Sequence, residues 1–552
     1  MATRDLPKSL NQFCFGWINQ IRDEMTLGKT QNELIEQDLA VKINDNKLDY
    51  ISSSDENEDE SQIETKVKFK SLWPAFASGA GLFSDGYVNA GIGNVISSLK
   101  IIYGKEFTQS NAMSNIGSIA FVGTVIGQLS FGVISDHISR HSGMLIANIM
   151  LIIFTLLCAV GSWGKTTQGF FACLTVWRFF LGIAIGSEYP TSSVIASEFA
   201  NQLPSGHRNR YFAWFTNMMI DLGFVVASFV PLVLLWIFST RHLRAVWRLS
   251  IGLGIVPQII LFFVRLKMKD SKSFQKLHMK KVSYKDYPIW LIIKFYWFRL
   301  FIISLIWFIY DFSVYSFGTF NTIIIGEIIP NGSLYQQWGW SVVFNLFYMP
   351  GAFIGALVGD YLGPRLTLAI GVGIQGIIGM AMSAKLDELK KHIAGFVVVF
   401  GIFTTFGEFG PGNNTGLLAS KTCATPIRGQ YYGIAAAIGK IGAFVGTWVF
   451  PAIQKHYSYD DKLALQVPFY VSSALCLFSA FLAIFFVPPV GQDSINKEDK
   501  LFLEYLRENG FDLKKLGDFG SVDVSSSPIN SNDENIVYDQ KNEDVDVHVQ
   551  EK

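Results

Sequence analysis

The chain has 552 residues, of which half are hydrophobic, 14% are aromatic and 16% are charged, and its mean hydropathy is +0.31. A soluble domain carries roughly 25% charged residues, so this composition indicates a membrane protein. The 45 basic and 45 acidic residues cancel, which excludes the positive field of a nucleic-acid-binding protein. The five cysteines are odd in number and mostly lie in apolar runs, which argues against a disulfide framework or a zinc site. No cofactor is expected.

Polar tails are predicted at both ends of the chain. Residues 1–70 contain the acidic run SSSDENEDE and no apolar segment long enough for a signal peptide, so they predict a disordered tail. Residues 490–552 are also charged and rich in Ser, Asn and Asp, although LFLEYLRENGF within them has the pattern of a short amphipathic helix. We expect solvated spacers, with a regulatory role as the alternative.

Between the tails lie apolar segments of roughly 20 residues, the length that crosses a bilayer as a helix. They predict an all-α membrane protein with twelve transmembrane helices in two six-helix bundles, at 71–266 and 291–489. The predicted segments are 73–98, 113–134, 143–162, 169–199, 210–238, 246–266, 291–326, 337–359, 364–384, 393–419, 429–452 and 467–488.

The linker between the two bundles, residues 267–290, is rich in lysine. The positive-inside rule therefore places it in the cytosol, together with both termini. This orientation puts the sequon Asn331-Gly332-Ser333 outside, where it is a candidate for glycosylation. Some basic residues oppose the assignment because they fall on the predicted outer side: Arg241, Arg244, Arg248, Lys385, Lys390 and Lys391.

Three pairs of polar residues recur at nearly one spacing, which predicts a duplicated six-helix unit. The spacings are 226 (311 − 85), 224 (360 − 136) and 226 (414 − 188), for the pairs Asp85 and Asp311, Asp136 and Asp360, and Glu188 and Asn414. The middle pair belongs to the similar runs GVISDHISRHSG and ALVGDYLGPR. In each run, a glycine permits close helix packing, and an acid and a base predict an ion pair that holds a cytoplasmic gate closed. An ordinary polar loop is the alternative for these residues, which are Gly132, Asp136, Arg140, Asp360, Gly363 and Arg365.

Charged residues in the middle of a span are costly and usually face a cavity that binds ions or substrate. Asp85 and Asp311 each lie about halfway along a predicted span, with aromatic residues nearby. Lys440 lies in a stretch rich in Gly and Ala and predicts an anion site, with an ion pair to a buried acid such as Asp311 as the alternative. Arg178 is a candidate partner for an acid near the mouth, or a structural arginine at a helix end.

The repeated gate motif in a twelve-span chain resembles the major facilitator superfamily. GSEYPTS in the fourth span resembles the signature of phosphate:proton symporters. The set SDGYVN, GSEYPTS, IKFYWFRL, GPGNNTG and GKIG is closer still to fungal glycerophosphoinositol and glycerophosphodiester permeases. This resemblance covers nearly the whole chain outside the tails.

The resemblance implies a monomeric plasma-membrane symporter that imports glycerophosphodiesters with protons, surrounded by membrane lipids. Glycerophosphoinositol is the first candidate, glycerophosphocholine the second, and inorganic phosphate:proton symport is the alternative function. The resemblance also implies that Lys440 binds phosphate, that Asp85 and Glu188 carry protons, and that Asp311 contacts substrate or proton.

Other polar and aromatic residues are expected around the substrate. Met218 replaces a glutamine of the phosphate symporters, which suits a larger ligand with different hydrogen bonds. The two asparagines of GPGNNTG are candidates for binding phosphate or hydroxyl groups, with an internally satisfied helix kink as the alternative. Asp221 and Glu408 receive no role. The expected substrate-binding residues besides Lys440 and Asp311 are Tyr87, Tyr189, Asn217, Met218, Trp307, Asn413 and Asn414.

Competing function classes fit the sequence less well. A membrane phosphodiesterase needs an activated nucleophile or a metal-ligand cluster, and neither spacing is present. A hexose carrier has little use for an intramembrane lysine and several acids. A receptor that binds without transporting stays open, because its binding residues would look the same. A choline head group favours an aromatic cage, but aromatic residues are too abundant to single one out.

Overall fold

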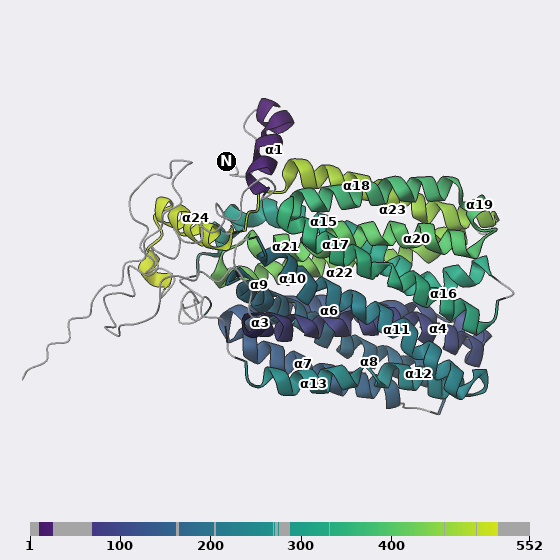
Figure 1. Ribbon diagram of the computed structural model, residues 1–552. Helices are drawn as coiled ribbons and strands as arrows, with labels where there is room; N and C mark the ends of the chain where they lie inside the picture. The colour runs from purple at the N-terminus through teal and green to yellow at the C-terminus, as the bar shows by residue number, and fades with distance from the viewer. Residues whose placement is uncertain are drawn as a thin grey trace, which may run out of the picture.

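A computed structural model of the protein describes residues 10–25, 69–161, 165–203, 206–268, 270, 274, 287–329, 332–457, 459–492 and 494–516. This part of the chain is helical, and its long helices lie side by side in one elongated bundle (Figure 1). Most of the linker at 267–290 and Asn331 of the sequon lie outside the described residues.

The first half of the bundle contains six predicted spans, several of which consist of two helices in sequence. They are α3 (Phe69–Gly79) with α4 (Phe83–Tyr103), α6 (Ala112–His137), α7 (Arg140–Val160), α8 (Thr167–Glu188) with α9 (Val194–Asn201), α10 (Arg208–Phe215) with α11 (Asn217–Phe238), and α12 (Leu243–Gly252) with α13 (Ile255–Arg265).

The second half repeats this arrangement. It comprises α15 (Ile289–Ile328), α16 (Leu334–Leu346) with α17 (Tyr348–Tyr361), α18 (Pro364–Ala384), α20 (Ile393–Gly407) with α21 (Asn413–Lys421), α22 (Arg428–His456) and α23 (Asp461–Phe486). The four-residue helices α5 (Lys105–Thr108) and α19 (Leu386–Leu389) lie in loops. In Figure 1 the purple and blue helices of the first half occupy one side and the green helices of the second half the other.

Eleven helical stretches in the described part of the chain are long and apolar enough to cross a membrane. The predicted first span is the exception, because α4 carries polar residues such as Asp85, Asn89 and Asn94 along its buried face. It nevertheless lies in the bundle against α11 and α15. The prediction of an all-α membrane protein with the two-bundle fold is confirmed.

Two spans are interrupted at matching places by a π-helical turn. In the fourth span, η2 (Tyr189–Ser193) separates α8 from α9 and contains Pro190. In the tenth, η4 (Glu408–Gly412) separates α20 from α21 and contains Pro411. Proline lacks the amide hydrogen that continues the α-helical pattern, and π-helical turns often mark functional positions. Both breaks lie beside the central cavity described below.

The N-terminal tail is more ordered than predicted. Residues 10–24 form α1 (Leu10–Glu24), in which Phe13 stacks on Phe485 of α23 with ring centroids 5.2 Å apart. At the other end of the chain, the amphipathic segment of the predicted tail belongs to α24 (Ser494–Glu508). Its buried face, which includes Phe502, Leu503 and Leu506, packs against α15 and α22. Both terminal helices lie at the same end of the bundle, which we call the terminal face (Figure 1).

Candidate functional site

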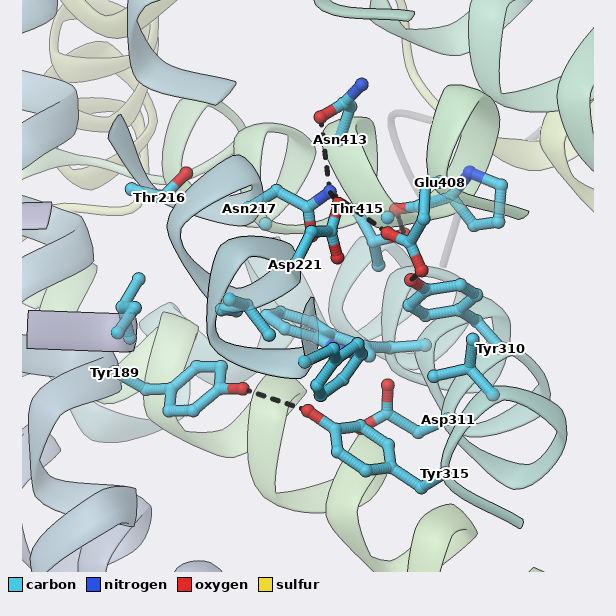
Figure 2. Close-up of a pocket in the computed structure, with 18 of the residues that line it drawn as sticks. Tyr189, Thr216, Asn217, Asp221, Tyr310, Asp311, Tyr315, Glu408, Asn413 and Thr415 are labelled. Carbon is cyan, nitrogen blue, oxygen red and sulfur yellow. Dashed lines mark hydrogen bonds between the residues drawn. The ribbon is translucent and has the colours of Figure 1, made fainter. Parts of the chain in front are cut away.

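A buried cavity of about 40 Å³ lies between the two halves, near the middle of the spans. Its walls come from α10, α11 and η2 of the first half and from α15, η4, α21 and α22 of the second. Five of the predicted substrate residues line it, and Lys440 does not: the five are Tyr189, Asn217, Trp307, Asp311 and Asn413. Figure 2 shows acids and tyrosines pointing into this space from both halves.

Lys440 lies between the two matching acids. Its Nζ atom is 3.5 Å from Oδ2 of Asp85 and 3.4 Å from Oδ2 of Asp311, and all three side chains are 1% exposed. The ammonium group also lies 3.6 Å from the ring centroid of Tyr315 and 5.1 Å from that of Tyr189. The ion pair that the sequence leaves open for Lys440 is therefore present in this conformation.

Asp85 joins the two halves through hydrogen bonds. The hydroxyl of Tyr189 donates to Oδ2, as does the hydroxyl of Tyr315 at 2.5 Å, and Asn89 donates to Oδ1 at 2.6 Å. One ammonium and two carboxyl groups leave an excess negative charge when both acids are ionised. A proton on one acid balances the cluster, so the site can hold or release a proton as its other charges change.

A second pair of acids, Asp221 and Glu408, occupies the opposite side of the cavity, and neither has a role predicted from the sequence. Glu408 accepts hydrogen bonds from Tyr310 at 2.7 Å and from Asn217 at 3.0 Å. The same amide nitrogen of Asn217 lies 3.4 Å from Asp221 and 3.2 Å from Oδ1 of Asn413. This cluster joins the fifth span to the tenth and is visible in the upper part of Figure 2.

Glu188 lies outside the lining of this cavity. Both of its oxygens accept from Arg265, at 2.7 and 3.0 Å, and Ser192 donates to one of them. Arg265, two residues before the predicted linker, is fully buried at the end of α13. Its guanidinium also donates to the carbonyl oxygens of Ala77 and Ser78. Glu188 is thus neutralised by a base that the sequence could not assign to it.

Tyr87 and Arg178 line a different, smaller cavity of about 20 Å³ within the first half. The hydroxyl of Tyr87 donates to the carbonyl oxygen of Ser250 at 2.5 Å, so the prediction that Tyr87 faces the substrate cavity is wrong for this conformation. Arg178 is buried beside Cys158 and forms no ion pair with an acid of the described residues. Arg178 also lies in the middle of α8 rather than at a helix end, so the structure shows neither the predicted acid partner nor the helix-end alternative.

Two other predicted substrate residues also lie elsewhere. Met218 follows Asn217 on α11 but does not line the cavity. A ligand in this cavity would therefore not contact the methionine that stands where the phosphate symporters have glutamine. Asn414 donates to the carbonyl oxygen of Gly410 at 2.8 Å, which satisfies the break in its own helix. For Asn414, the alternative of an internally satisfied kink is the one observed.

The first gate motif connects the halves at the terminal face. Asp136 accepts from the backbone amides of Gly429 and Gln430, both at 2.8 Å, and so caps the start of α22. Arg140 lies 3.6 Å from Asp136, as the motif predicts, and pairs more closely with Glu198. Gly132 permits this approach, because a Cβ at this position would lie 2.9 Å from the carbonyl oxygen of Gly429.

The second gate motif forms the reciprocal contact. Asp360 accepts from the backbone amides of Asn209, at 3.0 Å, and Arg210, at 3.3 Å, and so caps the start of α10 in the first half. Arg365 lies 3.2 Å from Glu24 of α1, a partner that the motif alone does not predict. Gly363 precedes α18 with a φ of 82°, a conformation that favours glycine.

The helix α24 adds a further layer at this face. Asp499 accepts from the backbone amide of Thr425 at 2.6 Å and from its hydroxyl at 2.7 Å, and Glu498 pairs with Arg299 at 2.8 Å. Burial raises the pKa of Asp499, although Arg428 and these hydrogen bonds act in the opposite direction. Thr425 also accepts from Arg140 at 2.9 Å, so α24 is joined to the gate itself.

Comparisons with known proteins agree with this architecture. Residues 73–287 match the family model described as Sugar (and other) transporter, and residues 308–517 match that of the Major Facilitator Superfamily. A solved structure of a proton:xylose symporter bound to 6-bromo-6-deoxy-D-glucose is 15% identical, with a TM-score of 0.66, and covers 78% of this chain and 98% of its own. At this identity, the likeness concerns the fold alone.

Among curated proteins, a glycerophosphocholine permease of Candida albicans is 75% identical over 99% of both chains. A major glycerophosphoinositol permease of the same organism is 70% identical over 95% of both chains. A glycerophosphoinositol transporter of Saccharomyces cerevisiae is 32% identical over 88% of this chain and 92% of its own. Identity over almost the whole length shows common descent and a common fold. The chain is a multi-pass membrane transporter that belongs to the major facilitator superfamily and, within it, to the group of fungal glycerophosphodiester permeases.

Proposed function

We propose that this protein is a proton-coupled symporter that imports glycerophosphodiesters across the plasma membrane by alternating access, with both termini in the cytosol. Glycerophosphoinositol and glycerophosphocholine are the two candidate substrates, since the relatives above are named for one or the other. The observation that carries the proposal is the buried ammonium of Lys440, held between Asp85 and Asp311 at the boundary of the two halves.

This arrangement favours coupling between an anion and a proton. A phosphodiester is a monoanion, and it competes with both carboxylates for the ammonium of Lys440. Protons on Asp85 or Asp311 weaken that competition and remove repulsion between the acids and the phosphate. The bound anion in turn favours the protonated acids, so each ligand strengthens the binding of the other. Symport follows when both are carried in one step.

Alternating access is supported by contacts that close the cavity at both ends. At the terminal face, Asp136 and Asp360 cap helices of the opposite half. At the other end, Tyr335 donates to the carbonyl oxygen of Leu235 at 3.2 Å, and Trp448 donates to Ser118 at 3.0 Å. A cavity of about 40 Å³ holds only a few waters, so loading a glycerophosphodiester requires the halves to separate at one end.

Replacing Lys440 tests the proposal. In Lys440→Ala protein reconstituted into liposomes, we expect uptake of radiolabelled glycerophosphoinositol and glycerophosphocholine to fall about 100-fold or more, because the phosphate loses its charged hydrogen-bond donor. Lys462→Ala, at an exposed lysine paired with Asp387, is the matched control and should retain uptake. Normal uptake by the Lys440 variant would refute the anion site.

Competition with unlabelled inorganic phosphate separates the proposal from its alternative. The chain is 26% identical over 68% of its length to an inorganic phosphate transporter of Toxoplasma gondii. We expect free phosphate to displace labelled glycerophosphodiester only at a large excess. Displacement by phosphate at the concentrations at which the diesters compete would favour phosphate symport.

A further inference from the structure

The second acid pair of the central cavity has no positively charged partner among the residues that the structure describes. Asp221 and Glu408 are each 1% exposed, and neither forms an ion pair within the described part of the chain. Oδ1 of Asp221 is buried without any hydrogen-bond donor from the same residues. Two acids in this position repel one another and are poorly solvated, so the cavity favours either protons or a positively charged ligand beside them.

The surroundings of these acids suit a bulky organic cation. Tyr310, whose hydroxyl donates to Glu408, contributes one aromatic wall, and Phe224 and Trp307 line the same cavity. The faces of aromatic rings attract cations such as quaternary ammonium groups, and nearby carboxylates add direct attraction. Asn217 holds Glu408 and Asp221 together, so both charges are directed at one region.

The acid pair and the Asp311–Lys440 ion pair lie on opposite sides of the central cavity, and Asp311 is the member of the ion pair that lines it. Tyr310 and Asp311 are consecutive in α15, yet Tyr310 contacts Glu408 whereas Asp311 contacts Lys440. Asp311 lines one end of the cavity and has Lys440 in direct contact, whereas Asp221 and Glu408 line the other end, as Figure 2 shows for the three acids. A phosphate that displaces Asp311 from Lys440 would therefore reach a positive group at the end opposite the acid pair. A ligand that is neutral overall, with a negative phosphate and a positive head group, matches this order of charges.

We propose that Asp221 and Glu408 bind the positively charged head group of a zwitterionic glycerophosphodiester, the quaternary ammonium of glycerophosphocholine, while Lys440 binds its phosphate. This inference rests on the proposed function and specifies its substrate. A polyol head group such as inositol can accept hydrogen bonds from Asn217 and Asn413, but it leaves the charge of the acids uncompensated. The acids thus select between substrates that share the same glycerophosphate.

A substrate analogue tests this selection on the unaltered full-length chain in liposomes. The 3,3-dimethylbutyl ester of glycerophosphate has the shape of glycerophosphocholine, but carbon replaces the charged nitrogen. We expect it to compete with labelled glycerophosphocholine about tenfold or more weakly than unlabelled glycerophosphocholine does. Equal competition by the two compounds would overturn the proposal, because the site would then recognise only shape.

Variants assign the selection to the acids. In Glu408→Gln and Asp221→Asn, the ratio of glycerophosphocholine to glycerophosphoinositol uptake efficiency (kcat/KM) should fall about tenfold, and Glu408→Asp, which keeps the charge, should retain more of it. Glu388→Gln is the matched control, since this exposed acid pairs with Lys385 far from the cavity. The ratio is independent of the amount of folded protein.

Each other outcome contradicts the proposal in its own way. An unchanged ratio with equal loss of both activities would mean that the acids carry protons. A ratio that rises would mean that they bind the polyol. Failure of the unaltered protein to take up any glycerophosphodiester would overturn the proposed function itself. That result is distinct from the outcomes above, because the analogue and variant comparisons both start from a protein that transports.

Discussion

At the scale of single residues, the most informative group is the lysine between two aspartates. Charges in the middle of a span are rare, so the sequence alone predicts Asp85, Asp311 and Lys440 as a functional set. The structure adds Tyr315, and it shows that Tyr315 and the predicted Tyr189 both donate to Asp85 from opposite halves. Their hydroxyl groups lie on helices far apart in the sequence, and no local pattern indicates that they converge.

The variant Asp85→Asn tests whether Asp85 carries the coupled proton. An amide oxygen still accepts hydrogen bonds from the tyrosines but cannot release a proton, so we expect the pH gradient to lose its effect on accumulation. Each proton coupled to a substrate allows about tenfold accumulation per unit of pH gradient. The measurement compares substrate accumulation in liposomes with and without an inside-alkaline gradient.

The control for this experiment is Asp387→Asn, which changes an exposed acid outside the cavity. Its accumulation should follow the pH gradient as in the unaltered protein. Gradient-driven accumulation that persists in Asp85→Asn would remove Asp85 from the proton path and direct attention to Asp311.

Other residue contacts were beyond prediction for identifiable reasons. Arg265 neutralises Glu188, but it lies at the end of a hydrophobic segment, where the sequence pattern is the same for a buried and an exposed base. Asp221 and Glu408 lie 187 residues apart (408 − 221) on spans that have no sequence signal for pairing. Met218 follows a cavity residue, and its orientation depends on the helical phase of α11 rather than on its type.

At the scale of elements, α22 shows how glycine positions a charged residue. A Cβ at Gly442 would collide with the carbonyl oxygen of Phe308 in α15, and one at Gly439 would collide with the ring of Trp307. The two helices therefore approach closely on either side of Lys440, as small residues allow within membranes. The glycine- and alanine-rich stretch around Lys440 thus provides a contact surface for α15, and its Gly433 lies equally close to α6.

The substitution Gly442→Ala, which adds one methyl group, tests this close packing of α22 against α15. Gly442→Ala should destabilise the protein by about 1–3 kcal/mol, because the backbone of α15 must shift to make room. Gly91→Ala is the control, since a Cβ there would lie 3.7 Å from Ala227 at ordinary contact distance. The thermal unfolding midpoints of the two purified variants give the comparison, and equal midpoints would contradict the close packing.

The helical elements at the ends of the chain show where composition misleads. Leu10, Phe13, Trp17 and Ile21 recur every three or four residues, which is a helical pattern, but the acidic run that follows dominates the composition of the region.

The breaks in the fourth and tenth spans are more predictable, because Pro190 and Pro411 mark them. The π-helical form of these breaks depends on tertiary packing and is not indicated by proline alone.

At the scale of the whole molecule, the two halves cap one another's helices. Asp136 of the first half caps α22 in the second, and Asp360 of the second caps α10 in the first. The sequence predicts the duplication and the position of both acids, but it places the ion pairs within each motif. The reciprocal caps depend on how the halves meet, which a repeat in the sequence does not reveal.

Closure of the terminal face can be followed through a native thiol. Cys423 is buried under α24, and burial raises the pKa of its thiol, so little reactive thiolate forms in the closed protein. Phe502→Ala removes a fully buried ring from α24, a change that costs about 3–5 kcal/mol in a packed core. We expect modification of Cys423 by a water-soluble maleimide to accelerate at least about tenfold.

Mass spectrometry of the labelled peptide measures this rate in the purified chain, with Cys14→Ser removing an exposed thiol. Glu508→Ala, on the exposed side of α24, is the control and should leave the rate unchanged. A rate in Phe502→Ala equal to that of the control would show that α24 does not protect this part of the terminal face.

The docking of α1 and α24 has a practical consequence for following motion. Although α1 comes from the beginning of the chain, its partners Phe485 and Arg365 belong to the second half, as do Arg299 and Thr425, which hold α24. Fluorophores attached to these two helices would therefore travel with the same rigid unit. A distance sensor for the transport cycle needs at least one dye on α7 or α13, at the far side of the first half.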